Sequence, residues 1–272
     1  TPGFTFEFTP QPTGELAPEF TSGPALEPAM LKKYRYWDYK NNVEVETQKV
    51  VPSNDDNIAP VFVHGGGRGS FGCVSVAPPA FLSEDEAFEV IQEEARRYGV
   101  IFSKDALKIE DVFVPAIDLN SFEHIAEGEE GASIESGYTV VRKGNLELDG
   151  STADKEIAFE FVSVNDLKDW EAEIETLDED GKYTRMMSTV EEYNCFRAAK
   201  SLREGIGGKT GETKVGIFYD PMPDYTEEQY KTLLSEYSSK KRISEEQKET
   251  AKQLLREQVI DFLNWLKAQG VI

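Results

Sequence analysis

The chain has 272 residues, of which 39% are apolar and 11% aromatic, so it can bury a sizeable core in one domain. Acidic residues outnumber basic ones 51 to 29, and the resulting formal charge of −22 repels nucleic acid and anionic membrane surfaces. No apolar run reaches the roughly 20 residues that a membrane-spanning helix needs. We therefore expect no nucleic-acid partner and no membrane-spanning segment.

Residues 1–30 are expected to form a proline-rich extended arm. The first 28 positions carry six of the 13 prolines and no basic residue, a composition that forms neither a helix nor a central strand. Such an arm is typical of what remains after a secretory or lipoprotein signal is removed, although an artificially shortened chain would begin in the same way. The arm predicts an exported protein, extracellular or in the cell envelope, with residues 31–272 as a single globular domain.

A hairpin and a helix are the first elements predicted after the arm. Aromatic and β-branched residues fill 32–39 and 43–51 and flank a turn-prone Asn-Asn pair, which indicates a β-hairpin. A helix is predicted over 84–97, because Ser83 and Glu86 have the spacing of a capping box and a glycine follows the last turn.

The rest of the chain is predicted to form strands first and helices later. Apolar residues alternate with period two over 156–162, which indicates a half-buried strand. Between Ala251 and Leu266 they recur at three- and four-residue spacing, which predicts a C-terminal docking helix. The remaining elements are strands over 107–119, 138–148 and 214–219, and helices over 165–172, 189–206 and 226–238.

This order of elements predicts the fold class. Strands gather in the first two thirds of the chain and helices in the last third, without a regular βαβ alternation. We expect an α+β fold, with a largely antiparallel sheet, helices on one face and the C-terminal docking helix. No internal repeat is present, which excludes solenoids and propellers.

A glycine-rich segment, residues 60–73, is the first motif that could carry chemistry. Its sequence PVFVHGGGRGSFGC resembles the oxyanion-hole loop of hormone-sensitive-lipase-type esterases, in which glycine N–H groups bind a developing oxyanion. That family also needs a Gly-x-Ser-x-Gly elbow, which this chain lacks. Two interpretations stay open: a flexible loop between two strands, or a loop that binds an anionic or carbonyl group. The ligand-binding candidates are His64, Gly65, Gly66, Gly67, Arg68 and Ser70.

Two other motifs are explained by turns and surface. The GKT of residues 208–210 is similar to the end of a Walker A loop, but Arg203 stands where that motif needs its first glycine, so a helix terminator is favoured. The acidic segment 166–180 predicts a solvated face with a turn at 178–181, and the alternative is a weak Ca²⁺ site.

Soft metal ligands are scattered along the chain. His64, Cys73, His124 and Cys195 have no pair at the spacing of a zinc site, so we predict no metal and no cofactor. Cys195 shares a predicted helix face with apolar residues, which favours a buried small side chain, and a disulfide with Cys73 is the alternative in an exported chain.

Residues 73–87 (CVSVAPPAFLSEDEA) and 255–270 resemble segments of uncharacterised exported proteins of anaerobic Gram-positive bacteria. The resemblance implies a secreted or envelope-associated setting and brings no activity with it. We therefore expect a non-catalytic binding or interaction module with an unknown ligand or envelope partner. The alternative is a hydrolase that uses the loop 64–67 as an anion hole, or a carboxylate pair such as Asp118 and Glu123.

Overall fold

The computed structural model describes residues 34–45, 47–49, 55–72, 81–116, 138–185, 190–223 and 245–272, together with 225, 226, 228, 229, 231–233 and 235. The expected arm over 1–30 lies outside these residues, as do Cys73, Asp118, Glu123 and His124.

A three-stranded sheet forms the centre of the molecule. Its strands are, in sheet order, β12 (Lys214–Tyr219), β8 (Ile157–Val162) and β7 (Gly150–Ser151). β8 and β12 run parallel, whereas β7 is antiparallel to β8. Every residue of β8 is buried, as expected of a strand that is covered on both faces.

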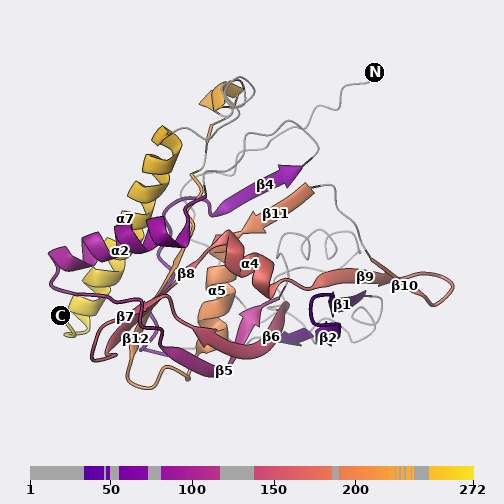
Figure 1. The fold of residues 1–272 in the computed structure, drawn as a ribbon, viewed down its shortest axis with the longest axis horizontal. Helices are drawn as coiled ribbons and strands as arrows, with labels where there is room; N and C mark the ends of the chain where they lie inside the picture. Colours follow the sequence, from indigo (N-terminus) through magenta and orange to yellow (C-terminus); the bar gives the residue numbers. More distant parts are fainter. Residues whose placement is uncertain are drawn as a thin grey trace.

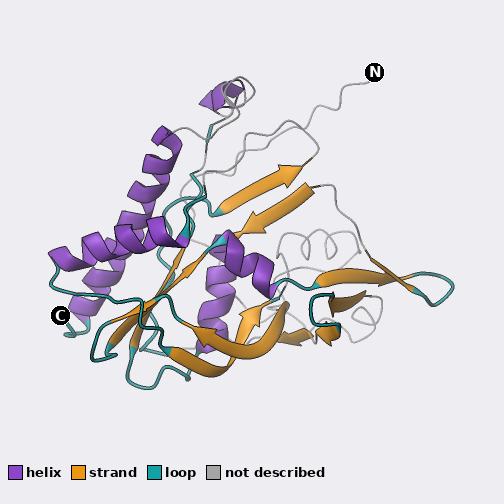
Figure 2. Ribbon diagram, in the orientation of Figure 1, coloured by secondary structure: helices purple, strands orange, loops and turns teal. Residues whose placement is uncertain are grey.

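Helices cover both faces of this central sheet (Figure 1; Figure 2). α5 (Cys195–Ile206) packs on the face that carries Ala158 of β8. α2 (Glu84–Arg97) and α7 (Glu245–Ala268) pack on the other face, against Phe159. The α+β class and the C-terminal helix are confirmed. The helices lie on both faces rather than on the single face expected, because β8 presents apolar side chains to each side.

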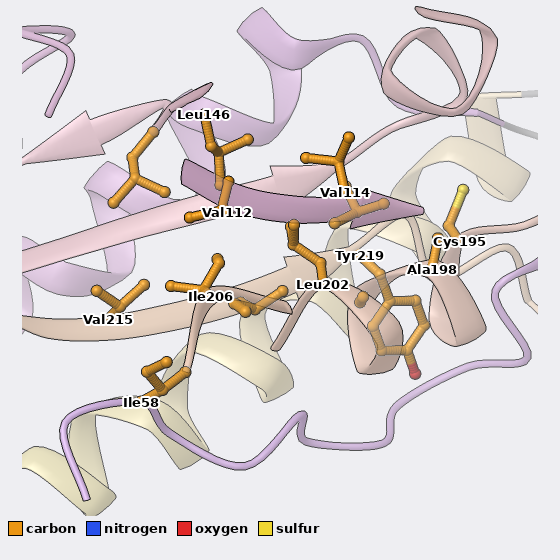
Figure 3. Close-up of a cluster of buried hydrophobic side chains, with 14 of the residues drawn as sticks. Ile58, Val112, Val114, Leu146, Cys195, Ala198, Leu202, Ile206, Val215 and Tyr219 are labelled. Atoms are coloured by element: carbon orange, nitrogen blue, oxygen red, sulfur yellow. The ribbon is translucent and has the colours of Figure 1, made fainter. Parts of the chain in front are cut away.

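The core beneath α5 joins the central sheet to a second sheet. That sheet has the antiparallel order β3 (Thr47–Lys49), β6 (Tyr138–Glu147), β5 (Lys108–Pro115). α5 lies so close to β5 that a Cβ atom at Gly205 would stand 1.9 Å from the carbonyl oxygen of Phe113. Figure 3 shows side chains that both sheets and α5 contribute to this core: Val112, Val114, Leu146, Leu202, Ile206 and Val215.

A four-stranded antiparallel sheet contains the predicted hairpin. Its order is β10 (Tyr183–Arg185), β9 (Glu173–Leu177), β1 (Tyr34–Asp38), β2 (Val43–Val45). The pairing of β1 with β2 confirms the hairpin as far as Val45, whereas Thr47–Lys49 of the predicted second strand pair with β6 instead. In Figure 1 the β9–β10 hairpin reaches away from the central sheet and its helices.

The glycine-rich segment and the chain before α5 form a two-stranded ribbon. β4 (Arg68–Gly72) pairs antiparallel with β11 (Val190–Asn194). The prediction of a helix over 189–206 is therefore wrong for its first third. The helix begins only after Asn194, whose side chain accepts a hydrogen bond from the N–H of Arg197 and caps the first turn.

Capping boxes start two other helices. Ser83 and Glu86 cap α2 as predicted, and Ser163 and Asp166 do the same for α4 (Val164–Trp170). Within the described ranges, no helix combines the length and the apolar character needed to cross a membrane.

Candidate functional site

The glycine-rich loop packs tightly against the end of β12. Gly65 and Gly67 have φ values of +86° and +63°, which glycine adopts without strain. A Cβ atom at Gly65 would lie 2.4 Å from the carbonyl oxygen of Pro221, and one at Gly67 would lie 2.8 Å from the ring of Tyr219. Both glycines are therefore needed for close packing inside the protein.

The backbone of the loop is hydrogen-bonded to the rest of the fold. The N–H of Gly67 donates to the carbonyl oxygen of Pro221 at 2.7 Å. The Tyr219 hydroxyl accepts from the N–H of His64 at 3.0 Å and donates to the carbonyl oxygen of Gly65 at 2.9 Å. An oxyanion hole needs N–H groups that point at the ligand. The Gly67 N–H instead serves an internal bond.

The side chain of His64 lies between two carboxylates of α7. Its Nδ1 is 3.2 Å from Glu257 Oε2, and its Nε2 is 2.8 Å from Asp261 Oδ2. These two residues are four positions apart, so one face of the helix holds both ring nitrogens. Gln258, between them, donates to the carbonyl oxygen of His64 at 3.3 Å. His64 thus anchors the loop on α7.

The candidates at the other end of the segment have different neighbours. Arg68 and Ser70 belong to β4, where their backbones pair with Asn194 and Glu192 of β11. His64 is held by α7. The beginning of the segment is therefore bound to helix α7, and its end is paired with strand β11. The segment connects these two elements.

Four carboxylates, three of them in helices or strands and one in the bend before β7, gather around β8, and we call them the carboxylate cluster. Glu160 lies on β8, Asp149 precedes β7, Asp166 is in α4, and Glu84 begins α2. Each of the other three carboxylates repels Glu160 electrostatically. The N–H of Phe161 donates to Asp149 Oδ2 at 2.7 Å. The cluster runs from fully buried Glu160 to exposed Glu84.

Burial raises the pKa values of three members of this cluster, Asp149, Glu160 and Asp166. Desolvation, with added repulsion from Glu84, raises the pKa of Asp149 to about 7 and that of Asp166 to about 6. Desolvation also raises the pKa of Glu160 well above its ordinary value. Among the residues that the structure describes, none is a hydrogen-bond partner of Glu160 Oε2. Asp149 and Asp166 can therefore exchange protons near neutral pH.

Two more buried groups lie near the end of β12. Desolvation raises the pKa of Asp220 to about 7, although its carboxylate accepts bonds from the N–H groups of Leu82 at 2.8 Å and Met222 at 3.3 Å. Cys195 is a free, buried thiol, and desolvation raises its pKa well above the ordinary value. The interpretation of Cys195 as a buried small side chain is confirmed, and it is not in a disulfide with Cys73.

The acidic segment 166–180 folds as the end of α4, strand β9 and a turn. The carboxylate of Asp178 accepts bonds from the N–H groups of Asp180 and Lys182, at 3.0 and 2.8 Å, which closes the predicted turn. Among the residues that the structure describes, no three His, Cys, Asp or Glu side chains are arranged to hold a metal ion.

The outward face of the four-stranded sheet carries an ordered layer of aromatic and charged side chains. The Arg35 guanidinium lies between the rings of Trp37 and Tyr183, with its Cζ 4.6 and 4.3 Å from their centroids. Its Nε donates to Glu175 Oε2 at 2.7 Å, and Glu175 also accepts from the Tyr39 hydroxyl. Stacking and a carboxylate together fix this guanidinium in one position.

A second arginine extends the layer. The Cζ of Arg185 lies 5.2 Å from the ring centroid of Tyr39, and Arg185 forms an ion pair with Glu173. On the opposite face of the sheet, buried Asp38 pairs with Arg142 of β6 at 2.8 Å. We call the outward layer the outer sheet face. It consists of Arg35, Trp37, Tyr39, Glu173, Glu175, Tyr183 and Arg185.

The sequence alone does not reveal the outer sheet face or the carboxylate cluster. It does not predict β9 or β10, since their acidic residues indicate a solvated surface. The usable signal for β9 was the alternation of acidic with uncharged residues over Glu173–Leu177. The cluster has no local signal, because Glu84 and Asp166 lie far apart in the chain.

Comparison of the chain with protein-family models, with curated proteins and with solved structures finds no match. The suggested kinship with exported proteins of anaerobic Gram-positive bacteria therefore stays an expectation.

Proposed function

We propose that this protein is a non-catalytic binding module, secreted or in the cell envelope, that contacts a partner protein through its outer sheet face. One observation carries the proposal: the Arg35 guanidinium is stacked between Trp37 and Tyr183 and held by Glu175. Tryptophan, tyrosine and arginine dominate the energetic centres of protein interfaces. Side chains that are fixed before binding lose little conformational entropy when a partner arrives.

The negative charge of the hairpin and of the whole chain favours a partner with a basic contact surface. The β9–β10 hairpin, residues 173–185, carries five acidic and two basic side chains. At its turn Asp178, Glu179 and Asp180 are exposed. The net charge of −22 also speeds the approach of a positively charged surface. The partner is therefore a protein with lysine or arginine around its contact surface.

The composition of residues 1–30 supports the proposed setting. A proline-rich stretch without basic residues suits a spacer between an anchor and a folded module. In that setting the module would reach its partner from a fixed point on the envelope.

Binding to a defined peptide tests the proposal. A random peptide library is selected on the immobilised full chain, and the enriched peptides are measured by calorimetry. Trp37→Ala should weaken binding roughly tenfold, since it removes one side of the arginine stack. Ile101→Ala is the control, because Ile101 is exposed but lies outside the outer sheet face. Failure to enrich any peptide, or equal binding by both variants, would refute the proposal.

A hydrolase is the second candidate, and the raised pKa values of Asp149 and Asp166 favour it. Against it, Glu160 between them is enclosed, and the Gly67 N–H is bonded internally. A panel of chromogenic glycosides and esters should give no turnover. Turnover that Asp149→Asn abolishes would establish the hydrolase instead.

A further inference from the structure

The carboxylate cluster connects the starts of two helices to β8. The Ser163 hydroxyl lies 3.3 Å from Glu84 Oε1 of α2 and 2.7 Å from Asp166 Oδ2 of α4. Asn165 adds a bond from its Nδ2 to Glu84 Oε1 at 3.2 Å. The first turns of α2 and α4 are therefore held together by polar groups that share these carboxylates.

Glu160 is the group in the cluster that ionises at the greatest cost. The residue is 2% exposed, and its carboxyl group accepts a bond from the N–H of Asp149, while Oε2 has no partner within the described part of the chain. A buried carboxylate without a full set of donors is far less stable than the neutral acid. The neutral acid can also donate a hydrogen bond, which the carboxylate cannot.

The charges around the cluster do not neutralise it. Within the described ranges, Lys104 is the cation that interacts with Asp149, and it is already in an ion pair with Asp85. On α4, Asp169 repels Asp166, and Asp169 itself pairs with Lys40 at 2.8 Å. Ionisation of the cluster therefore adds repulsion between α2, α4 and β8.

We propose that the carboxylate cluster is a pH-responsive junction, which holds α2 and α4 against β8 when it is protonated and loosens them when it ionises. The effector is the proton, and the groups that exchange it near neutral pH are Asp149 and Asp166, both of which are repelled by Glu84. Because the cluster is not part of the outer sheet face, the junction does not depend on the proposed binding function.

Amide hydrogen exchange of the full chain tests the junction. Protection factors, corrected for the intrinsic pH dependence of exchange, are measured at about pH 5.5 and about pH 8. We expect protection in α4 to fall roughly tenfold at the higher pH, while protection in the last turn of α5 changes less than about twofold. The last turn of α5, around Leu202 and Ile206, is the internal control because it contributes no residue to the cluster, whereas Cys195 at the start of α5 interacts electrostatically with Asp166. A parallel change in α4 and in this turn of α5 would overturn the proposal.

A variant separates the junction from a general effect of charge. Asp149→Asn keeps an acceptor for the N–H of Phe161 but removes a titrating group. It should reduce the pH-dependent loss of protection in α4 by at least about half. Glu212→Gln removes an exposed charge outside the cluster and should leave the loss unchanged. Equal behaviour of the two variants would also overturn the proposal. If Asp149→Asn fails to fold, the comparison of α4 with the last turn of α5 in the wild-type chain decides alone.

Discussion

At Gly67 the glycine-rich loop has no space for a side chain. The φ of this glycine is positive, and an added Cβ would lie 2.7 Å from the Cβ of Phe196 as well as against the ring of Tyr219. The sequence predicts a glycine loop here. It does not indicate which glycine is packed, because the ring of Tyr219 reaches the loop from a distant strand.

Substitution of this glycine should destabilise the fold more than its backbone angle alone requires. We expect Gly67→Ala to lower the free energy of unfolding by roughly 2–4 kcal/mol, since it combines a strained φ with a clash. The measurement is equilibrium unfolding in urea.

Gly211 provides a matched control for this prediction. It has a similar φ of +62°, but nothing lies within 4 Å of an added Cβ. Gly211→Ala should therefore cost only about 1 kcal/mol. Equal losses for both variants would show that the clash at Gly67 contributes nothing.

Among the elements, those whose ends are encoded locally are predicted best. The capping box of Ser83 and Glu86 specifies the start of α2, and apolar spacing specifies the buried stripe of α7. Pairing with β4 and the Asn194 cap together set the boundary between β11 and α5, and of these the sequence offers only the cap as a local signal. The alternation in β8 predicts a half-buried strand, whereas the structure buries all its residues, because helices cover both faces.

α7 should contribute strongly to stability through Phe262. This ring packs 3.0 Å from the position of a Cβ on Gly216 and lies edge-on to Phe218. We expect Phe262→Ala to cost roughly 3–5 kcal/mol in the free energy of unfolding, because it empties a fully buried site. Asn264→Ala, on the exposed side of the same helix, should cost less than about 0.5 kcal/mol. Similar stabilities of the two variants in urea unfolding would place α7 outside the core.

For the whole molecule, buried carboxyl groups predict a definite response to pH. In the folded chain Asp149 and Asp220 keep their protons up to about pH 7 and Asp166 up to about pH 6, whereas the ordinary pKa is 3.8. Between these values the folded state binds more protons than the unfolded state. Their contribution to stability is complete below the ordinary pKa and is lost as the pH rises through about 6 to 7.

The free energy of unfolding should therefore be higher at about pH 5 than at about pH 7.5 by several kcal/mol, because each of the three carboxyl groups contributes about 1–3 kcal/mol. Urea unfolding at the two pH values measures this difference. A lower stability at the acidic value would show that carboxylates with lowered pKa values, such as Glu86, dominate instead.

Both candidate sites are formed only when the whole molecule folds. The outer sheet face combines β1 with β9 and β10, and the carboxylate cluster combines Glu84 with Asp166. Composition predicts an acidic module with a core. It cannot predict these groupings, since each depends on contacts between parts of the chain that are distant in sequence.

The connection between the parallel strands β8 and β12 has one further consequence. It contains α4, β9, β10, β11 and α5, and only part of it packs in the core. The β9–β10 hairpin is thus an insertion in the connection between two parallel strands, and β1 pairs with its strand β9. Its tip could diversify during evolution, or be exchanged by grafting, without repacking the interior, so a family built on this scaffold could acquire new specificities at one place.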